Sequence, residues 1–406
     1  MIFRRVLMIF FLSFIIASSF SFAHTENVFR DMDVIWSNIW SDYVDPFFNN
    51  ADWHRLPDKY KPLILDTQNE EEAYEYLVQM VEELDDASTY LLPPISPMEQ
   101  EPVETEYTGI GIAIGEAHVL NELTDKHQFS EDDIAILDVF PDTPAHDAGL
   151  LIGDIIVGVD EWDAKGATME EISQRVRGPA GSEVLLIVED PLGNEKEYLI
   201  KRRIVDLMPK VIRNTYAEDK VVHINIFGLV PTAVEIAQAY LPDEDQILLL
   251  DLRSASVGDL GSLTRVLSWL TESEDFGSFY SRQDRFDIER LSDVEAVKPQ
   301  KLYILVNERT SGLPEILALV LSELENATLL GYQTRGGFSL TKRVILPSGW
   351  NIVFSVARYE SPLGVGVHEI GIKPDILLEQ VTLQQLREKD DPLLDKALEI
   401  IFTEAL

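Results

Sequence analysis

The chain has 406 residues, and its 71 acidic side chains outnumber 33 basic ones, which gives a net charge of −38. Such a negative field repels nucleic acid and anionic lipid surfaces and keeps a protein soluble, so nucleic acid is a poor candidate partner. The chain has no cysteine, which excludes disulfides, thiol catalysis and a lipoprotein anchor.

The first 23 residues have the layout of a secretory signal peptide. Arg4 and Arg5 precede an uncharged apolar stretch over 6–16, and small side chains stand at Ser21 and Ala23. We therefore predict cleavage after Ala23 and export to the periplasm or the extracellular space. The alternative is an uncleaved anchor, for which the apolar run falls short of the ~20 residues of a membrane span. Contact with a membrane is expected only in that case.

Residues 24–92 are predicted to be helical. Apolar side chains recur there at helical spacing in two stretches. These are Val28, Met32, Ile35, Trp36, Ile39 and Trp40, and then Ala73, Tyr76, Leu77, Met80, Val81 and Leu84. Residues 93–106 carry four prolines and four glutamates with little apolar pattern, so we predict a linker.

Residues 107–205 change to short strands between glycine turns. The pattern predicts strands at 109–115, 134–139, 152–160, 183–189 and 195–201. Two helices are expected among them, a short one that ends at Gly149 and an amphipathic one over 169–176.

Residues 206–383 alternate strands and helices, which predicts an α/β core. Strands are expected at 221–226, 247–252, 302–306 and 328–331, and helices at 233–240, 260–270 and 315–325. Residues 272–300 are charged, and we expect an irregular, solvated excursion there. A closing helix is predicted within 384–406, over 393–402.

In their order, these regions resemble the carboxyl-terminal processing peptidases, also called tail-specific proteases. The residues from Leu84 to Leu91 read LDDASTYL, which is similar to that family's "LDD-S-YL" signature. The stretch from Gly109 to Ile112 reads GIGI and resembles the start of its PDZ module, and residues 371–375 read GIKPD. The resemblance implies a multidomain α+β or α/β protein: a helical N-terminal region, a PDZ-like β-rich module and an α/β protease core of the ClpP/crotonase type.

That family cleaves polypeptides near their C-termini with a serine nucleophile and a lysine base, which desolvation makes able to accept a proton. In this sequence the serine position falls on Gly312 and the lysine position on Gly337. The separation of 337 − 312 = 25 residues is the one the family uses. The family's glutamine position is Thr341. Because glycine has neither hydroxyl nor amine, we predict that the inherited mechanism does not operate and that the chain is a pseudoenzyme.

A relocated serine–lysine pair stays open as an alternative. Ser311 adjoins Gly312, but one helical step turns a side chain ~100° away. Lys342 lies five residues past Gly337, which is roughly 16 Å along an extended strand. Ser311 is more simply explained as the N-terminal cap of the helix that opens at Leu313.

The histidines predict no metal site, because no pair has metal-ligand spacing on a helix. His223 lies in an apolar strand and is expected to be a satisfied core or rim histidine. His368 and Glu369 lie in the family's loop before Gly371 and need no catalytic role. No cofactor and no metal is predicted.

The PDZ-like module keeps its working parts. By the resemblance, it would bind an extended C-terminal peptide as an added strand, with backbone amides around 107–111 on the terminal carboxylate. The predicted peptide-binding residues are Gly109, Ile110, Gly111, Ile112 and Ile114 in the loop and strand, and Met169, Ile172 and Val176 on the helix.

We therefore predict an exported pseudo-peptidase that binds polypeptide C-termini without cleaving them, or docks on an active protease relative. One alternative is an active serine endopeptidase with a non-standard or relocated catalytic pair. Another is that the PDZ-like module only closes the fold and binds no peptide, so that the protein is a structural partner of an active protease or an envelope complex.

Overall fold

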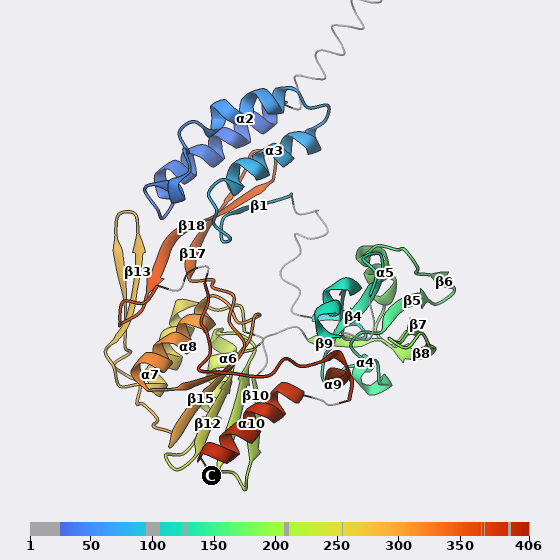
Figure 1. Ribbon diagram of the computed structural model, residues 1–406, viewed down its shortest axis with the longest axis vertical. Helices are drawn as coiled ribbons and strands as arrows, with labels where there is room; N and C mark the ends of the chain where they lie inside the picture. Colours follow the sequence, from blue (N-terminus) through green and yellow to red (C-terminus); the bar gives the residue numbers. More distant parts are fainter. Residues whose placement is uncertain are drawn as a thin grey trace, which may run out of the picture. The chain divides into compact units, whose positions relative to one another are not determined.

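The computed structural model describes residues 25–94, 106–124, 129–206, 211–253, 255–366, 368, 370–388 and 391–405. The predicted signal peptide, most of the predicted linker and Glu369 lie outside these residues. The chain forms two compact units (Figure 1). The first contains residues up to 101 together with 210–376, and the second contains 102–209 together with 377–406.

The N-terminal part of the first unit is helical, as its apolar spacing predicts. Residues 25–42 form a helix, followed by a turn of 3-10 helix, η1 (Phe48–Asn50), and by α2 (Leu56–Leu65) and α3 (Glu70–Glu82). The side chain of Asn69 caps α3 by accepting from the N–H of Glu72. The apolar faces of these helices bury Met32, Ile35 and Leu77 against Phe354 of the sheet described next.

An antiparallel sheet carries these helices. Its strands are β1 (Tyr90–Leu92), β13 (Asp275–Ser281), β14 (Arg285–Glu289), β17 (Ser339–Ile345) and β18 (Asn351–Glu360). Their order is β1-β18-β13-β14, and β17 also pairs with β18. The expectation of an irregular excursion over 272–300 is therefore wrong for 275–289, which form a hairpin. Phe276, Phe279 and Ile288 are buried there, while charged neighbours face solvent and mask the apolar alternation.

The α/β core of the first unit is confirmed. Its strands are β10 (Val211–Tyr216), β11 (Val221–Ile226), β12 (Ile247–Asp251), β15 (Lys301–Val306), β16 (Thr328–Gly331) and the short edge strand β19 (Ile376–Leu377), in that order across the sheet. Strands β11, β12, β15 and β16 are parallel, and β10 is antiparallel to β11. Helices α6 (Pro231–Gln238), α7 (Leu260–Leu270) and α8 (Leu313–Leu324) pack on it through one continuous apolar core.

The second unit is a β-rich module with helices at its rim. A five-stranded path runs β3 (Ile112–Glu116), β4 (Ile134–Val139), β5 (Ile155–Val159), β7 (Glu183–Glu189) and β8 (Glu195–Lys201), and β6 (Trp162–Asp163) pairs with β5. A separate pair consists of β2 (Glu106–Gly109) and β9 (Arg203–Asp206). The helical pieces are η2 (Ala117–Leu123), α4 (Pro144–Ala148) and α5 (Met169–Val176).

The expected single strand over 109–115 is two strands in different sheets. The chain turns at Gly111, whose φ is +88°, a backbone conformation that L side chains rarely adopt. A Cβ at this position would also lie 2.3 Å from Cβ of Thr143. The glycine-flanked loop that the sequence indicates therefore divides the expected strand.

Residues 377–406 belong to the second unit, which the sequence did not indicate. Helix α9 (Leu383–Glu388) places Leu383 in an apolar cluster with Ile155 and Val157. Arg387 forms an ion pair of 2.8 Å with Asp154, whose carboxyl is buried. The predicted closing helix is present as α10 (Pro392–Ala405). Within the described residues, no helix combines the length and apolarity needed to cross a membrane.

Candidate functional site

Gly312 and Gly337, which the sequence resemblance predicts at the family's serine and lysine positions, lie side by side. Gly312 precedes α8 with φ 69° and ψ −131°, and a Cβ there would meet only the carbonyl oxygen of Gly337, at 3.7 Å. A Cβ on Gly337 would lie 3.1 Å from the nitrogen of Gly312. The fold thus brings together the two positions that the family resemblance pairs, and both lack a side chain. Thr341, at the glutamine position, is exposed on β17 just after a register shift.

A buried carboxylate holds this glycine-lined site together. Glu315 in the first turn of α8 has no solvent exposure. Its Oε2 accepts hydrogen bonds from the N–H groups of Gly312 and Gly337, at 2.8 and 2.7 Å. Its Oε1 accepts from the N–H of Gly336 at 2.6 Å and from the hydroxyl of Thr334. Four donors on one carboxylate suit its ionised form, which only accepts.

Two details of the sequence interpretation change at this helix. The N-terminal cap of α8 is Gly312, not Ser311, because the Glu315 side chain reaches back to the backbone N–H of Gly312. The backbone N–H of Ser311 instead donates to the carbonyl of Ala255. Lys342 points to a different partner, since its Nζ lies 2.6 Å from Asp42 Oδ2. A charged lysine in an ion pair is poorly suited to act as a base.

A second polar cluster in the same unit joins three segments that are distant in sequence. Ser339 Oγ at the start of β17 lies 3.1 Å from Nδ1 and 3.2 Å from Nε2 of His368. Nε2 of His368 lies 3.6 Å from Oδ1 of Asp86, in the LDD signature. The side chain of Asp86 is buried, and it also accepts from Tyr43, Thr89 and the N–H of Ser88.

The hydrogen bonds of Asp86 decide its ionisation. Burial raises the pKa of this carboxyl, but the nearby His368 ring and the hydrogen bonds from Thr89 and Ser88 outweigh that effect and hold the pKa below its usual range. The sequence did not indicate this cluster, because no spacing relates residues 86, 339 and 368.

His223 is a buried core residue, as expected, with an ionic partner. Its Nε2 lies 3.2 Å from Oδ2 of Asp251, the last residue of β12. Arg253 also pairs with Asp251, at 2.6 Å. Burial raises the pKa of Asp251, but Arg253 and His223 hold it well below its usual range. The Nδ1 atom of His223 is buried and makes no hydrogen bond among the described residues, so the histidine is only half satisfied. No group of three or more acidic or histidine side chains in the described part of the chain could hold a metal ion.

The second unit presents an open strand edge beside a helix. Strand β3 pairs with β4 on one side and is the last strand of its sheet, and α5 packs beside it. Ile112 and Ile114 on β3 are half-buried against the module's core, and Ile110 is fully buried. An edge strand next to a helix is the geometry in which a peptide adds as a further strand.

The predicted residues of α5 divide into two groups. Ile172 and Val176 are 0% and 6% exposed, so they are part of the module's core. Met169, at the first turn, is 51% exposed and is available to a ligand. Gly109, the last residue of β2, and Gly111, in the loop between β2 and β3, are both buried.

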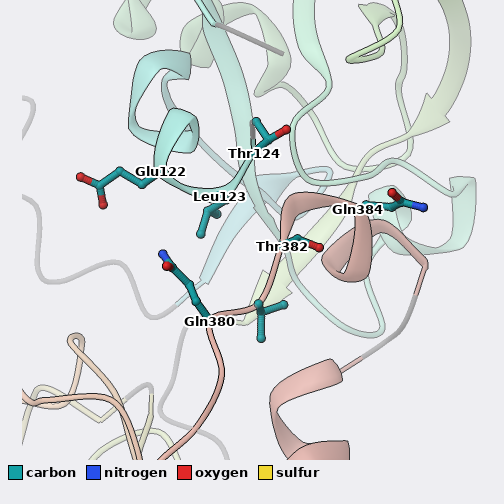
Figure 2. A pocket seen from close by; sticks show the side chains of 7 residues that line it. Glu122, Leu123, Thr124, Gln380, Thr382 and Gln384 are labelled. Carbon is teal, nitrogen blue, oxygen red and sulfur yellow. The ribbon is translucent and has the colours of Figure 1, made fainter. Parts of the chain in front are cut away.

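A further hollow of about 320 Å³ lies in the same unit, between η2 and the segment before α9 (Figure 2). Its lining residues are Glu122, Leu123, Thr124, Gln380, Val381, Thr382 and Gln384. They come from two segments that the sequence analysis did not connect.

Three family models match successive parts of the chain. The model of the Tricorn protease C1 domain matches residues 26–82, that of the PDZ domain matches 136–190, and that of peptidase family S41 matches 221–378. The matches coincide with the helical region, the β-rich module and the α/β core with β13 to β18.

Whole-length comparisons agree with these models. The chain is 28% identical over 382 residues to a carboxyl-terminal-processing protease of Synechocystis, covering 90% of this chain and 85% of that protein. It is 29% identical over 334 residues to one of Bartonella bacilliformis, covering 79% and 72%.

Solved structures share the fold. The photosystem II D1 C-terminal processing protease matches with a TM-score of 0.54 and 22% identity over 90% of this chain and 96% of that one. The tricorn protease matches with a TM-score of 0.56 and 16% identity, over 94% of this chain and 37% of that one. Together, the matches to peptidase family S41, to the PDZ domain and to curated carboxyl-terminal-processing proteases support a protein of the carboxyl-terminal-processing protease type.

Proposed function

We propose that this member of the family is exported, captures polypeptide C-termini in its PDZ groove and does not cleave them by the family's serine–lysine chemistry. The observation that carries the proposal is the pair Gly312 and Gly337. The two positions are adjacent, they keep the family's spacing, and neither has a hydroxyl or an amine. Nucleophile and base are both needed for that mechanism, and losing either usually removes most of the catalysis.

The groove supports the binding half of the proposal. Strand β3 offers free main-chain groups along its edge, and Ile112, Ile114 and Met169 give an apolar surface for the last side chains of a peptide. We therefore expect ligands with a free carboxylate and an apolar final residue. Export rests on the sequence pattern of the first 23 residues.

The test is peptide binding by the purified protein, measured by fluorescence anisotropy. Peptides that end in a free carboxylate should bind, and their C-terminally amidated counterparts should bind at least tenfold more weakly, because the amide removes a charge-assisted hydrogen bond. Met169→Glu should weaken binding several-fold. Leu192→Glu is the matched control, since Leu192 is 87% exposed in the turn between β7 and β8, away from the β3 edge.

Gly111 is a poor site for this test. A bulky residue there would meet Thr143 and a positive φ, so it would damage the module as well as the groove. Equal affinity for free and amidated peptides, or an unchanged affinity of Met169→Glu, would remove the groove from the proposal. Intact mass of the bound peptide after long incubation tests the absence of cleavage.

A second candidate function is serine hydrolysis at a different place in the first unit. It is favoured by the contacts of Ser339, His368 and Asp86, which provide a hydroxyl, an imidazole and a buried carboxylate in series. In this reading the Ser339 proton passes to Nδ1 of His368 as Oγ attacks an acyl carbon, and the leaving group then takes that proton. Water hydrolyses the resulting ester.

A fluorophosphonate probe separates the two functions, because it phosphonylates activated serine hydroxyls. Labelling that maps to Ser339 and is abolished by His368→Gln would establish a serine hydrolase. Cleavage of a bound peptide by this enzyme would then overturn the proposal that the protein does not cut its ligands. No labelling, under conditions in which trypsin is labelled fully, would remove the second candidate.

A further inference from the structure

A buried arginine stands between β8 and β9 in the second unit. Arg202 is 7% exposed, and all three nitrogen atoms of its side chain donate hydrogen bonds within the module. Nε donates to the carbonyl of Val176 at 2.8 Å, and Nη2 to the carbonyl of Arg175 at 2.9 Å. Nη1 donates to the carbonyl of Glu183 at 2.8 Å and to the hydroxyl of Ser182 at 3.0 Å. Among the ion pairs of the described residues none includes Arg202, so carbonyls and a hydroxyl hold this charge.

Two of these carbonyls belong to the last turn of α5, which ends at Val176. The last carbonyls of a helix have no partner within the helix and carry partial negative charge, so a cation there is favourable. The planar fork of a guanidinium can reach these carbonyls and the start of β7 at the same time. Arg202 therefore fastens the C-terminal end of α5 to the sheet.

Gly178 shows how closely the guanidinium is enclosed. A Cβ at this position would lie 2.9 Å from Nε and 3.0 Å from Cζ of Arg202. The φ of Gly178 is not positive, so the contact with Arg202, rather than the backbone conformation, is the reason for a glycine here.

The residue after Arg202 holds the other side of the groove. Arg203 is the first residue of β9 and lies opposite Gly109, the last residue of β2, and the loop into β3 follows Gly109. The C-terminal end of α5 also lies against β2, since the guanidinium carbon of Arg177 is 5.3 Å from the centre of the Tyr107 ring. Two consecutive residues thus join α5, through a side chain, and the loop before β3, through the pairing of β9 with β2.

We propose that Arg202 is a positioning residue for peptide binding: it fixes the end of α5 relative to residues 109–111 and so sets the geometry where the peptide carboxylate enters. This inference rests on the proposed function, because it assumes that the groove takes polypeptide C-termini. Arg202 acts through α5 and makes no contact with the peptide. It lies outside the eight residues predicted to bind the ligand.

The expected consequence is selective for the free carboxylate. A peptide that adds to β3 lies about 4.8 Å from that strand, so the position of α5 decides how well its last residue fits. Charge-assisted hydrogen bonds are short and depend strongly on geometry, and only a free carboxylate makes them at the loop. A displaced α5 should therefore weaken free-carboxylate peptides more than amidated ones.

Arg202→Lys is the informative substitution, because lysine keeps the positive charge but cannot form the fork. Fluorescein-labelled peptides that end in Val or Leu, free or amidated, serve as probes in fluorescence anisotropy. Free-carboxylate peptides should bind about fivefold to tenfold more weakly, comparable to the loss of one hydrogen bond, and amidated ones should stay within about twofold. In the peptide-free protein, the NMR amide signals of residues 109–111 should move.

Arg175→Lys is the matched control on the same helix. Six residues separate Arg175 from Met169, so helical spacing turns its side chain ~120° away from the groove side. Its guanidinium carbon lies 3.8 Å from the centre of the Trp162 ring on β6. Its backbone carbonyl is unchanged by the substitution, so peptide affinities and the signals of 109–111 should stay as in wild type.

Gly178→Ala tests the same contact without changing Arg202. The added Cβ should push the guanidinium from its place, so this variant should also weaken free-carboxylate peptides by about fivefold. Because both substitutions act through one contact, the double variant should be no weaker than the worse single one. Gly178→Ala also keeps the test open if Arg202→Lys does not fold.

The outcomes separate this role from the function beneath it. Wild-type affinity in a folded Arg202→Lys or Gly178→Ala would overturn the positioning role and leave the proposed function standing. Equal weakening of free and amidated peptides, or additive effects in the double variant, would overturn it as well, since a general loss of stability would produce them. If wild type binds no free-carboxylate peptide, the proposed function fails and the role of Arg202 with it.

Discussion

Glu315→Gln is the sharpest test of how the glycine-lined site is held together. The substitution keeps the size of the side chain and replaces one carboxylate oxygen by an NH2 group. Each carboxylate oxygen accepts from two donors, one pair being Gly312 and Gly337, the other Gly336 and Thr334. Whichever way the amide is turned, its NH2 group faces two donors.

The expected cost follows from that geometry. A donor left without an acceptor in a buried site costs about 1–3 kcal/mol, and Glu315 has no solvent exposure, so water offers little replacement. Two such donors, with some relaxation of the loop, predict a loss of about 2–4 kcal/mol. This is a large part of the 5–15 kcal/mol by which native proteins are typically stable.

The assay is urea unfolding together with hydrogen exchange of the segments 311–316 and 334–338. Exchange is needed because a protein with two units does not have to unfold in one step. Glu325→Gln is the control, since Glu325 is exposed at the other end of α8 and should stay within about 0.5 kcal/mol of wild type. Equal stability of the two variants, with unchanged protection of 334–338, would refute the claim that Glu315 joins these loops.

Three other predictions concern the backbone at Gly312, the buried carboxyl of Asp86 and the ion pair of Arg387. Gly312→Ala should cost about 1–2 kcal/mol because its φ is +69°, whereas Gly366→Ala, with open space and no positive φ, should be neutral in urea unfolding. Asp86→Asn should lose stability relative to Asp85→Asn above pH 5. The pKa of Asp86 is lower in the folded than in the unfolded protein, so its ionised form stabilises the fold above the unfolded pKa of about 3.9, and this stabilisation disappears as the pH falls through the folded pKa. The difference in stability between Asp86→Asn and Asp85→Asn should therefore shrink in acid. A difference that does not depend on pH would contradict this prediction. Arg387→Gln should cost about 3 kcal/mol by leaving the Asp154 carboxyl buried without its partner, and Arg387→Gln with Asp154→Asn should recover most of that loss.

The α/β core could be predicted from sequence because its strands are buried on both faces. Ile247–Asp251 is buried at every position, and Lys301–Val306 at every position but the first, so both stretches are apolar runs. The helix at 169–176 could also be predicted from sequence, and Thr168 and Glu171 form a capping box at its start.

The antiparallel sheet was missed for the opposite reason. In β13 and β14 one face carries charged side chains such as Arg285 and Asp287, so the composition of 272–300 is typical of a solvated loop. Strand β13 pairs with β18, and paired residues such as Ser281 and Ala357 are 357 − 281 = 76 positions apart, a pairing that sequence patterns do not encode.

The candidate sites also divide into those that the sequence could predict and those that it could not. The proximity of Gly312 and Gly337 could be expected from sequence, because the family resemblance pairs these two positions. The cluster of Asp86, Ser339 and His368 was not, because its members meet only through the sheet and the loop before Gly371.

The proposed loss of the catalytic serine has a consequence for the backbone conformation at Gly312. A serine nucleophile at a strand-to-helix turn is held in a backbone conformation unfavourable to L side chains, and such a conformation costs about 1–3 kcal/mol. Gly312 keeps a turn of this kind, with φ 69° and ψ −131°, but glycine adopts it without that cost. Gly337 likewise lets its backbone approach the nitrogen of Gly312, where a Cβ would lie at 3.1 Å. Under the proposed function, glycine at both positions favours the stability of the site around Glu315 over the family's chemistry, which is the usual direction of the exchange between stability and activity. The scaffold can then be retained for holding polypeptides, with selection acting on the groove of the second unit.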